Sequence, residues 1–295
     1  MESTYTGRKV AIFADAHSLL EPTYAALEDM RKRGITEIYS LGDNIGFGPN
    51  PGEVMDVMDA YGVVSIAGNA EEYSILGLKP FSSYMTGARI AEQVWLESKL
   101  TDEHIDNLKL YRRSIDLCLG GKKIALCHFA NDVRVYFGDY STWSFQDAMS
   151  AGENPTKQFY HTNSPQELEM VAQRSAREGE YYDGYRSMQQ DPLFGGKRVS
   201  EYDEIIQGHV HFGYIHNNEG TRFRTLRAVG MGYGPNEPVD MAYYIILHEK
   251  IDGYDVEEVY VLYDRKAMIE HIINSDMPNK EIKRNGTTNF GYKTK

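Results

Sequence analysis

Seven side chains able to bind metal ions stand just after apolar, strand-like runs of this sequence. They are Asp15, His17, Asp43, Asn69, His128, His209 and His211. Oxygen and imidazole donors without a thiolate favour iron, manganese or zinc over an ion that prefers oxygen alone. The residue types therefore point to a site for adjacent metal ions.

Each of these residues, taken alone, has a simpler explanation. An Asp or Asn after a strand is commonly a turn residue or a helix cap, and a single buried His is more often hydrogen-bonded than metal-bound. The joint pattern, in which every member follows a predicted strand, favours the metal site over the separate explanations.

Alternating strands and helices place the first four candidates at one edge of a sheet. We expect strands over residues 9–14, 37–41 and 61–67, with helices over 22–33 and after residue 50. This alternation predicts a parallel sheet, and ligands of such sheets gather beyond the carboxyl ends of the strands. A hairpin of residues 114–119 and 123–127 then delivers His128.

The remainder of the chain predicts further helices, antiparallel strands and two irregular regions. Helices are expected over 89–99, 101–108 and 265–275, and strands over 213–216, 221–229, 241–248 and 255–263. Residues 131–200 are rich in Tyr, Phe and polar side chains and predict an insertion over the site. The polar, basic residues 280–295 predict a mobile tail.

Composition excludes several classes of protein. The 295 residues carry a formal charge of -12, which argues against a protein that coats nucleic acid. No apolar run reaches membrane-spanning length, and residues 1–8 are too polar and short for a secretory signal. Cys118 and Cys127 suit neither a zinc knuckle nor a redox motif, so we expect reduced core thiols. We therefore predict a cytoplasmic protein without a membrane or stable nucleic-acid partner, and homo-oligomerisation stays open.

The order of the motifs resembles the calcineurin-like metallophosphoesterase superfamily. The motifs are Asp15-x-His17, Gly42-Asp43, Gly68-Asn69, His128 and Gly208-His209-x-His211. The stretch from Gly42 to Pro51 is similar to the small bacterial phosphodiesterase and diadenosine-tetraphosphatase-like branch of that family. The resemblance implies one α/β domain over residues 1–279, with 131–200 as an inserted cap. Its expected fold is a four-layer α/β/β/α sandwich of two mixed sheets flanked by helices, with the antiparallel C-terminal strands in the second sheet.

The resemblance also implies roles for the seven residues. Asp43 would bridge two ions, which would be iron, manganese or zinc. The other ligands of the first ion would be Asp15, His17 and His211. The other ligands of the second ion would be Asn69, His128 and His209. Ions about 3.5–4 Å apart can bind the attacking and leaving oxygens of an in-line displacement, with metal-bound hydroxide as the nucleophile.

Two departures from the family pattern bear on the substrate. The chain reads Gly68-Asn69-Ala70-Glu71 where the family usually has a histidine in place of Ala70, so no catalytic residue beyond the metal ligands is assigned. This histidine is usually credited with protonating the leaving oxygen, and its loss favours substrates with good leaving groups. Phe129 follows His128 where glycine is frequent, and it either packs in the core or forms a wall of the pocket. Together with Arg134, Tyr136 and Arg186 of the insertion, Phe129 completes the substrate-binding candidates.

The sequence thus predicts a two-metal hydrolase of phosphodiesters or nucleotide phosphoanhydrides. Two alternatives stay open. One is a phosphomonoesterase, and the other is a catalytically weak, metal-binding interaction scaffold, which the loss of the histidine favours.

Overall fold

Two mixed β-sheets pack against each other in the computed structural model. The structure describes residues 4–76, 87–112, 114–128, 199–209, 211, 213–218, 220–231, 240–278 and 280. Apart from residues 199, 200 and 280, the expected insertion and tail lie outside these ranges.

The first sheet has the strand order β10-β9-β1-β2-β3. Strands β1 (Tyr5–Phe13), β2 (Glu37–Ser40) and β3 (Val64–Ser65) run parallel. Strand β9 (Met241–Lys250) pairs antiparallel with β1, and β10 (Tyr254–Leu262) pairs antiparallel with β9. The expectation that these two C-terminal strands belong to the second sheet is therefore wrong.

The second sheet has the strand order β4-β5-β6-β8-β7. The hairpin of β4 (Ser114–Leu119) and β5 (Lys122–Cys127) is confirmed, and β6 (Glu204–Gln207) runs parallel to β5. Strand β8 (Thr221–Thr225) pairs parallel with β6 and antiparallel with β7 (Tyr214–Asn218). A short 3-10 helix, η4 (Val199–Glu201), precedes β6.

The alternation of side chains along β1 explains why the sheets pack. Val10 and Ile12 join the apolar cluster between the two sheets, with Leu126 and Ile206 of the second sheet. Phe13, on the opposite face, joins the cluster beneath the helices. Successive strand residues point to opposite faces, so one strand supplies both layers.

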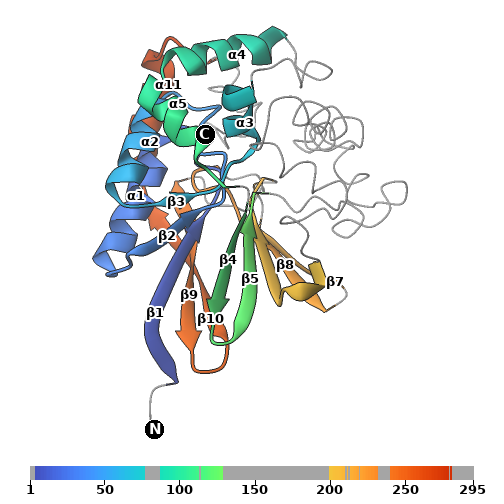
Figure 1. The fold of residues 1–295 in the computed structure, drawn as a ribbon. Coiled ribbons are helices and arrows are strands. Elements are labelled where there is room, and N and C mark those ends of the chain that lie inside the picture. Colours follow the sequence, from blue (N-terminus) through green and yellow to red (C-terminus); the bar gives the residue numbers. More distant parts are fainter. Residues whose placement is uncertain are drawn as a thin grey trace, which may run out of the picture.

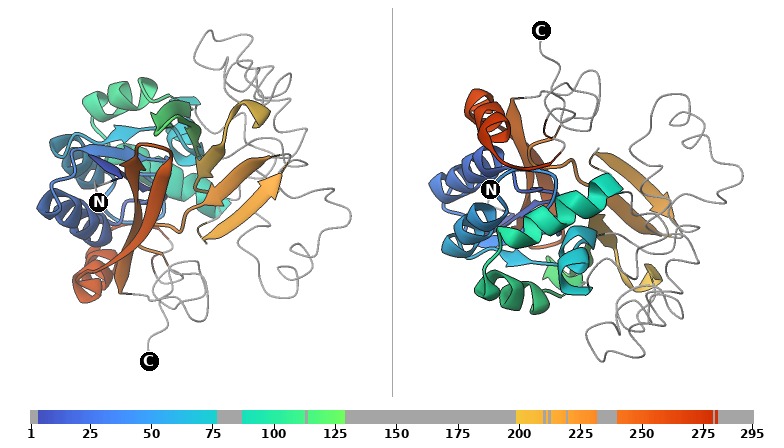
Figure 2. Two further views of the ribbon diagram at one scale, coloured as in Figure 1. Left: turned by 90° about the horizontal axis from the view of Figure 1, so that it is seen from below. Right: turned by 90° about the horizontal axis from the view of Figure 1, so that it is seen from above.

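Helices cover the outer face of the first sheet. There, α1 (Leu20–Lys32) and α2 (Pro51–Ala60) contribute buried residues to one cluster, and α11 (Arg265–Asn274) packs against α1 (Figure 1). Helices α3 (Asn69–Leu76), α4 (Gly87–Ser98) and α5 (Asp102–Lys109) gather beyond the ends of the strands (Figures 1 and 2). The expected α/β sandwich of two mixed sheets flanked by helices is confirmed.

Some local expectations differ from the structure. Helix α3 was not expected, the third strand is only two residues long, and β8 ends at Thr225 instead of Val229. Cys127 is buried as expected, but Cys118 is exposed, because it points outward from the edge strand β4. None of the helices in the described part of the chain has the length and apolarity needed to span a bilayer.

The packing between the sheets generates a stability prediction. Leu126 is 0% exposed at this interface, so Leu126→Ala should lower the free energy of unfolding by about 2–5 kcal/mol. Leu262 on β10 is 66% exposed, and Leu262→Ala should cost less than about 0.5 kcal/mol. Urea denaturation of both variants checks this, and equal losses would contradict the assignment of the core.

Candidate metal centre

The candidate ligands follow the carboxyl ends of five strands. Asp15 and His17 come after β1, Asp43 after β2 and Asn69 after β3. His128 comes after β5, and His209 and His211 come after β6. Backbone hydrogen bonds continue the strand pairing into these loops, from Asp15 N–H to the Gly42 carbonyl at 3.0 Å and from Gly208 N–H to the His128 carbonyl at 2.9 Å. Both sheets therefore deliver ligands to one shared edge.

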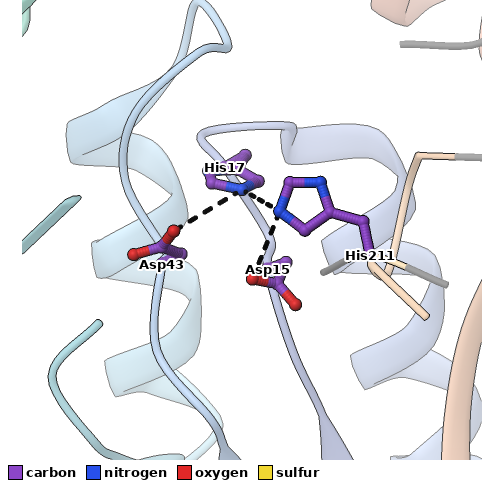
Figure 3. A group of neighbouring side chains, drawn as sticks. All are labelled: Asp15, His17, Asp43 and His211. Atoms are coloured by element: carbon purple, nitrogen blue, oxygen red, sulfur yellow. Dashed lines mark hydrogen bonds and ion pairs between the residues drawn. The ribbon is translucent and has the colours of Figure 1, made fainter. Parts of the chain in front are cut away.

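A first group contains Asp15, His17, Asp43 and His211, whose side chains point toward one another (Figure 3). His17 Nε2 lies 2.9 Å from His211 Nε2 and 3.8 Å from Asp43 Oδ2. His211 Nε2 lies 3.4 Å from Asp15 Oδ1. Donor atoms bound about 2.1 Å from one shared ion are themselves about 3 Å or slightly more apart. The spacing of the group therefore fits one ion.

A second group contains Asp43, His128 and His209. His128 Nε2 lies 2.9 Å from His209 Nδ1 and 3.5 Å from Asp43 Oδ2. Asp43 belongs to both groups through the same oxygen, Oδ2, whereas its Oδ1 accepts a hydrogen bond from the Ala70 N–H at 2.7 Å. An oxygen in this position can bridge two adjacent ions.

Asn69 turns its amide toward the second group. Its Oδ1 lies 3.2 Å from His128 Nε2, among atoms that are mostly acceptors. In the reversed orientation, the amide nitrogen donates to His209 Nδ1 at 2.8 Å and to Asp43 Oδ2 at 3.3 Å. A bound cation would stabilise the orientation in which the oxygen faces inward, because the oxygen could then bind the ion.

Two of the rings are oriented by backbone carbonyls. His128 Nδ1 donates to the Leu41 carbonyl at 2.8 Å, and His17 Nδ1 faces the Ile45 carbonyl at 3.3 Å. Such bonds keep a proton on Nδ1, so that Nε2 is the atom that faces inward, as in many metal-binding histidines. Each inward Nε2 can bind a metal ion when it carries no proton, which suits a metal centre.

Burial and neighbouring charges set the protonation of the site. Burial and the nearby His211 lower the pKa of His17 to about 4, and burial and His128 lower the pKa of His209 to about 3. Burial alone would lower the pKa of His128, but Asp43 and the other carboxylates raise it to about 10. Burial alone would raise the pKa of Asp43, but His128 and His17 hold it below its ordinary value. The metal-free site thus holds buried carboxylates and a protonated His128.

The ligand segments are also strained. The non-glycine residues with positive φ in the described ranges are Asp15, His17, Ser18, Asp43, Phe47, His209 and His211, with values between 48° and 71°. Five of them are candidate ligands. A left-handed backbone is unfavourable for residues other than glycine, and such strain concentrates at functional sites.

Glu71 is a site residue that the sequence analysis did not single out. Its buried carboxylate accepts hydrogen bonds from the backbone N–H groups of Asp43 at 2.9 Å, Asn44 at 2.7 Å and Gly68 at 2.7 Å. It therefore ties the loop of Asp43 to the loop of Asn69. The signal was the acidic residue two positions after Asn69, in the first turn of α3.

Close backbone approach at two glycines brings the loops together. A Cβ on Gly208 would lie 2.7 Å from Asp15 Oδ2, and one on Gly68 would overlap the backbone and carboxylate of Asp43. The Asp15 carboxylate also accepts the His209 N–H at 3.0 Å, which links the two sheets. Any side chain at these glycines would push ligands apart.

The structure thus brings all seven candidate ligands together. The substrate-binding candidates Phe129, Arg134, Tyr136 and Arg186 lie outside the described residues. Ala70 is 5% exposed and joins an apolar cluster with Ile45 and Leu96, so the place of the usual family histidine is filled by a methyl group. The donors fit two cations, because the buried carboxylates and imidazoles form two groups that share Asp43.

The role of Glu71 yields a prediction. Glu71→Gln keeps the size of the side chain but turns an amide NH2 toward backbone donors, so we expect a loss of about 1–3 kcal/mol in unfolding free energy. Metal affinity should fall by about 10–100-fold, as for other residues that orient ligands. Glu53→Gln on the exposed side of α2 is the matched control. Unfolding and metal titration check the pair, and a Glu71→Gln protein with unchanged affinity would contradict the role.

The protonated His128 yields a pH prediction. A metal ion must displace the proton from this ring, so binding near pH 7 should release about one proton. Affinity should accordingly rise with pH, by roughly tenfold per unit, and fall as the solution is acidified below neutrality. Calorimetry in two buffers of different ionisation enthalpy measures the release. Binding with no proton release would show that His128 is already neutral.

The chain is similar to known proteins along nearly its whole length. No protein-family model matches the chain. It is 25% identical over 272 residues to an uncharacterised protein of Methanocaldococcus jannaschii, a match that covers 91% of this chain and 93% of that protein.

Two solved structures share the fold over nearly the whole chain. A hypothetical protein from Pyrococcus horikoshii gives a TM-score of 0.61 at 17% identity, covering 94% of this chain and 96% of that one. A metallophosphoesterase from Sphaerobacter thermophilus gives a TM-score of 0.57 at 18% identity, covering 95% and 98%. The chain therefore has the metallophosphoesterase fold, as the order of its motifs predicted.

Proposed function

We propose that this protein is a dinuclear metal-dependent phosphoesterase that hydrolyses phosphodiesters or nucleotide phosphoanhydrides. The observation that carries the proposal is the position of Asp43, whose Oδ2 lies between the two ligand groups. The fold shared with a metallophosphoesterase supports it.

The bound ions would supply Lewis acidity toward the phosphoryl group and an acidified water as nucleophile. The protein contributes the positions of the donors. Asp15, His17 and His211 would hold one ion and Asn69, His128 and His209 the other, with Asp43 shared. Iron, manganese and zinc are the ions that this donor set favours.

The surroundings of the ligands support the choice of substrate. Ala70 cannot donate a proton, and it is buried among apolar side chains. A leaving oxygen must then depart without help from this position, which favours aryl esters and phosphoanhydrides over alkyl monoesters. Phe129, Arg134, Tyr136 and Arg186 remain proposed contacts for the rest of the substrate.

The bridging role of Asp43 is tested by replacing one oxygen. Asp43→Asn should reduce hydrolysis of bis-p-nitrophenyl phosphate with Mn²⁺ to the uncatalysed rate, because a neutral amide is a poor bridge between cations. It should also lower the number of ions bound. Asp59→Asn, on the exposed end of α2, should leave both unchanged. Ordinary turnover by Asp43→Asn would end the bridging assignment.

Substitutions at Ala70 test whether the missing histidine limits the leaving groups that the protein can accept. Ala70→His should raise the rate on alkyl monoesters relative to aryl diesters, by up to about 10²–10⁴-fold if the ring reaches the leaving oxygen. Ala70→Asn, which adds bulk without an acid of suitable pKa, is the control. Equal rate ratios in the two variants would show that the missing histidine does not determine the substrate.

An interaction scaffold is the second candidate function, and Ala70 is the observation that favours it. A scaffold needs no complete set of ligands, whereas the structure brings seven together. A protein that binds two ions but hydrolyses no member of a broad phosphoester panel would be assigned to this class.

A further inference from the structure

We propose that Phe47 is a positioning residue that holds the ring of His17 in its metal-binding orientation. The inference rests on the proposed metal centre. It assigns a task to a residue in the loop between Asp43 and α2 that binds no metal itself.

The first support is the contact between the two rings. Their centroids lie 4.7 Å apart with an interplanar angle of 75°, so the rings meet edge to face. This arrangement is the one that aromatic pairs prefer, and it restricts rotation of both rings. His17 is fully buried, so rotation of its ring depends on what its neighbours allow.

The second support is the weak hydrogen bond of His17. Its Nδ1 faces the Ile45 carbonyl at 3.3 Å, whereas His128 Nδ1 lies 2.8 Å from the Leu41 carbonyl. The longer bond orients its ring less firmly. His17 Nε2 must nonetheless face both His211 and Asp43, so a second restraint on the ring is needed.

The third support is the backbone of Phe47. Its φ is +54°, in a region that bulky residues rarely adopt. Filling an apolar space alone would not require this conformation. The same loop bonds the backbone of His17 on both sides, from His17 N–H to the Asp43 carbonyl at 2.8 Å and from Gly48 N–H to the His17 carbonyl at 2.9 Å. The loop therefore encloses His17, and the strained residue is the one that contacts its ring.

The fourth support is the packing behind Phe47. Its ring packs against a buried cluster that includes Leu19, Met231 and Met268 of α11. The ring is therefore supported from behind while it contacts His17 in front. Through it, the apolar cluster at α11 restrains a residue of the metal centre.

Two substitutions distinguish the effect of the aromatic ring of Phe47 from the effect of its backbone strain. Phe47→Leu keeps an apolar side chain and the strained backbone, whereas Phe47→Gly removes the side chain and relieves the strain. Both lose the edge-to-face contact, so both should bind one of the two ions at least tenfold more weakly, while the other ion binds as in the wild type. Phe47→Tyr keeps the ring and should bind both ions like the wild type. The readouts are Co²⁺ titration followed by its visible absorption, which reports the ligand field, and thermal unfolding of the metal-free protein.

Met30→Ala is the control, because it weakens a different buried cluster, beneath α1, to which Phe47 does not belong. It should lower thermal stability and leave both ion affinities unchanged. Wild-type affinity in both Phe47→Leu and Phe47→Gly would overturn the inference, as would an equal loss of affinity in Met30→Ala. If the wild-type protein itself binds no ion, the proposed function fails instead, so the two failures are distinguishable.

Discussion

Two carboxylates buried at the shared edge of the sheets are the constraint on which this structure depends. Asp15 is 0% exposed and Asp43 2% exposed, and burying an unpaired charge is costly. In the metal-free protein, a proton on His128 offsets part of this charge. Two cations would offset it fully and would also satisfy the inward lone pairs. The buried negative charge therefore requires compensation, which a proton on His128 provides in part and two metal ions would provide in full.

Much of the fold and of the ligand set could be predicted from local signals, because each ligand lies within four residues of the end of a strand. The pairing of β9 could not, although its sequence held a hint. Residues 242–247 are all buried, as in a strand covered on both faces, and the apolar run matches a central strand. Alternation and length identify a strand but not its neighbours, so β9 and β10 were placed in the wrong sheet. Local signals also do not show that ligands from the two sheets meet at one site. Only the order of the motifs, through the family resemblance, predicted that.

Glu71 and Phe47 were missed as site residues for a different reason. Their side-chain types do not indicate these roles, which depend on the conformation of the backbone around them. Glu71 is useful because four loop N–H groups converge on it, and Phe47 because its left-handed φ brings its ring to His17. A sequence displays donors to a metal, but it does not display which residues hold those donors in place.

The left-handed conformations explain how one short segment serves two ions. In an extended strand, residues two apart share a face, so His209 and His211 would point the same way. Both have positive φ, and they separate: His209 Nδ1 lies by His128, whereas His211 Nε2 lies by His17 and Asp15. Turning the chain sharply at the strand end thus distributes two neighbouring imidazoles between the two groups that Asp43 joins. The strain follows from this requirement, because a relaxed, extended segment would direct both rings to the same group.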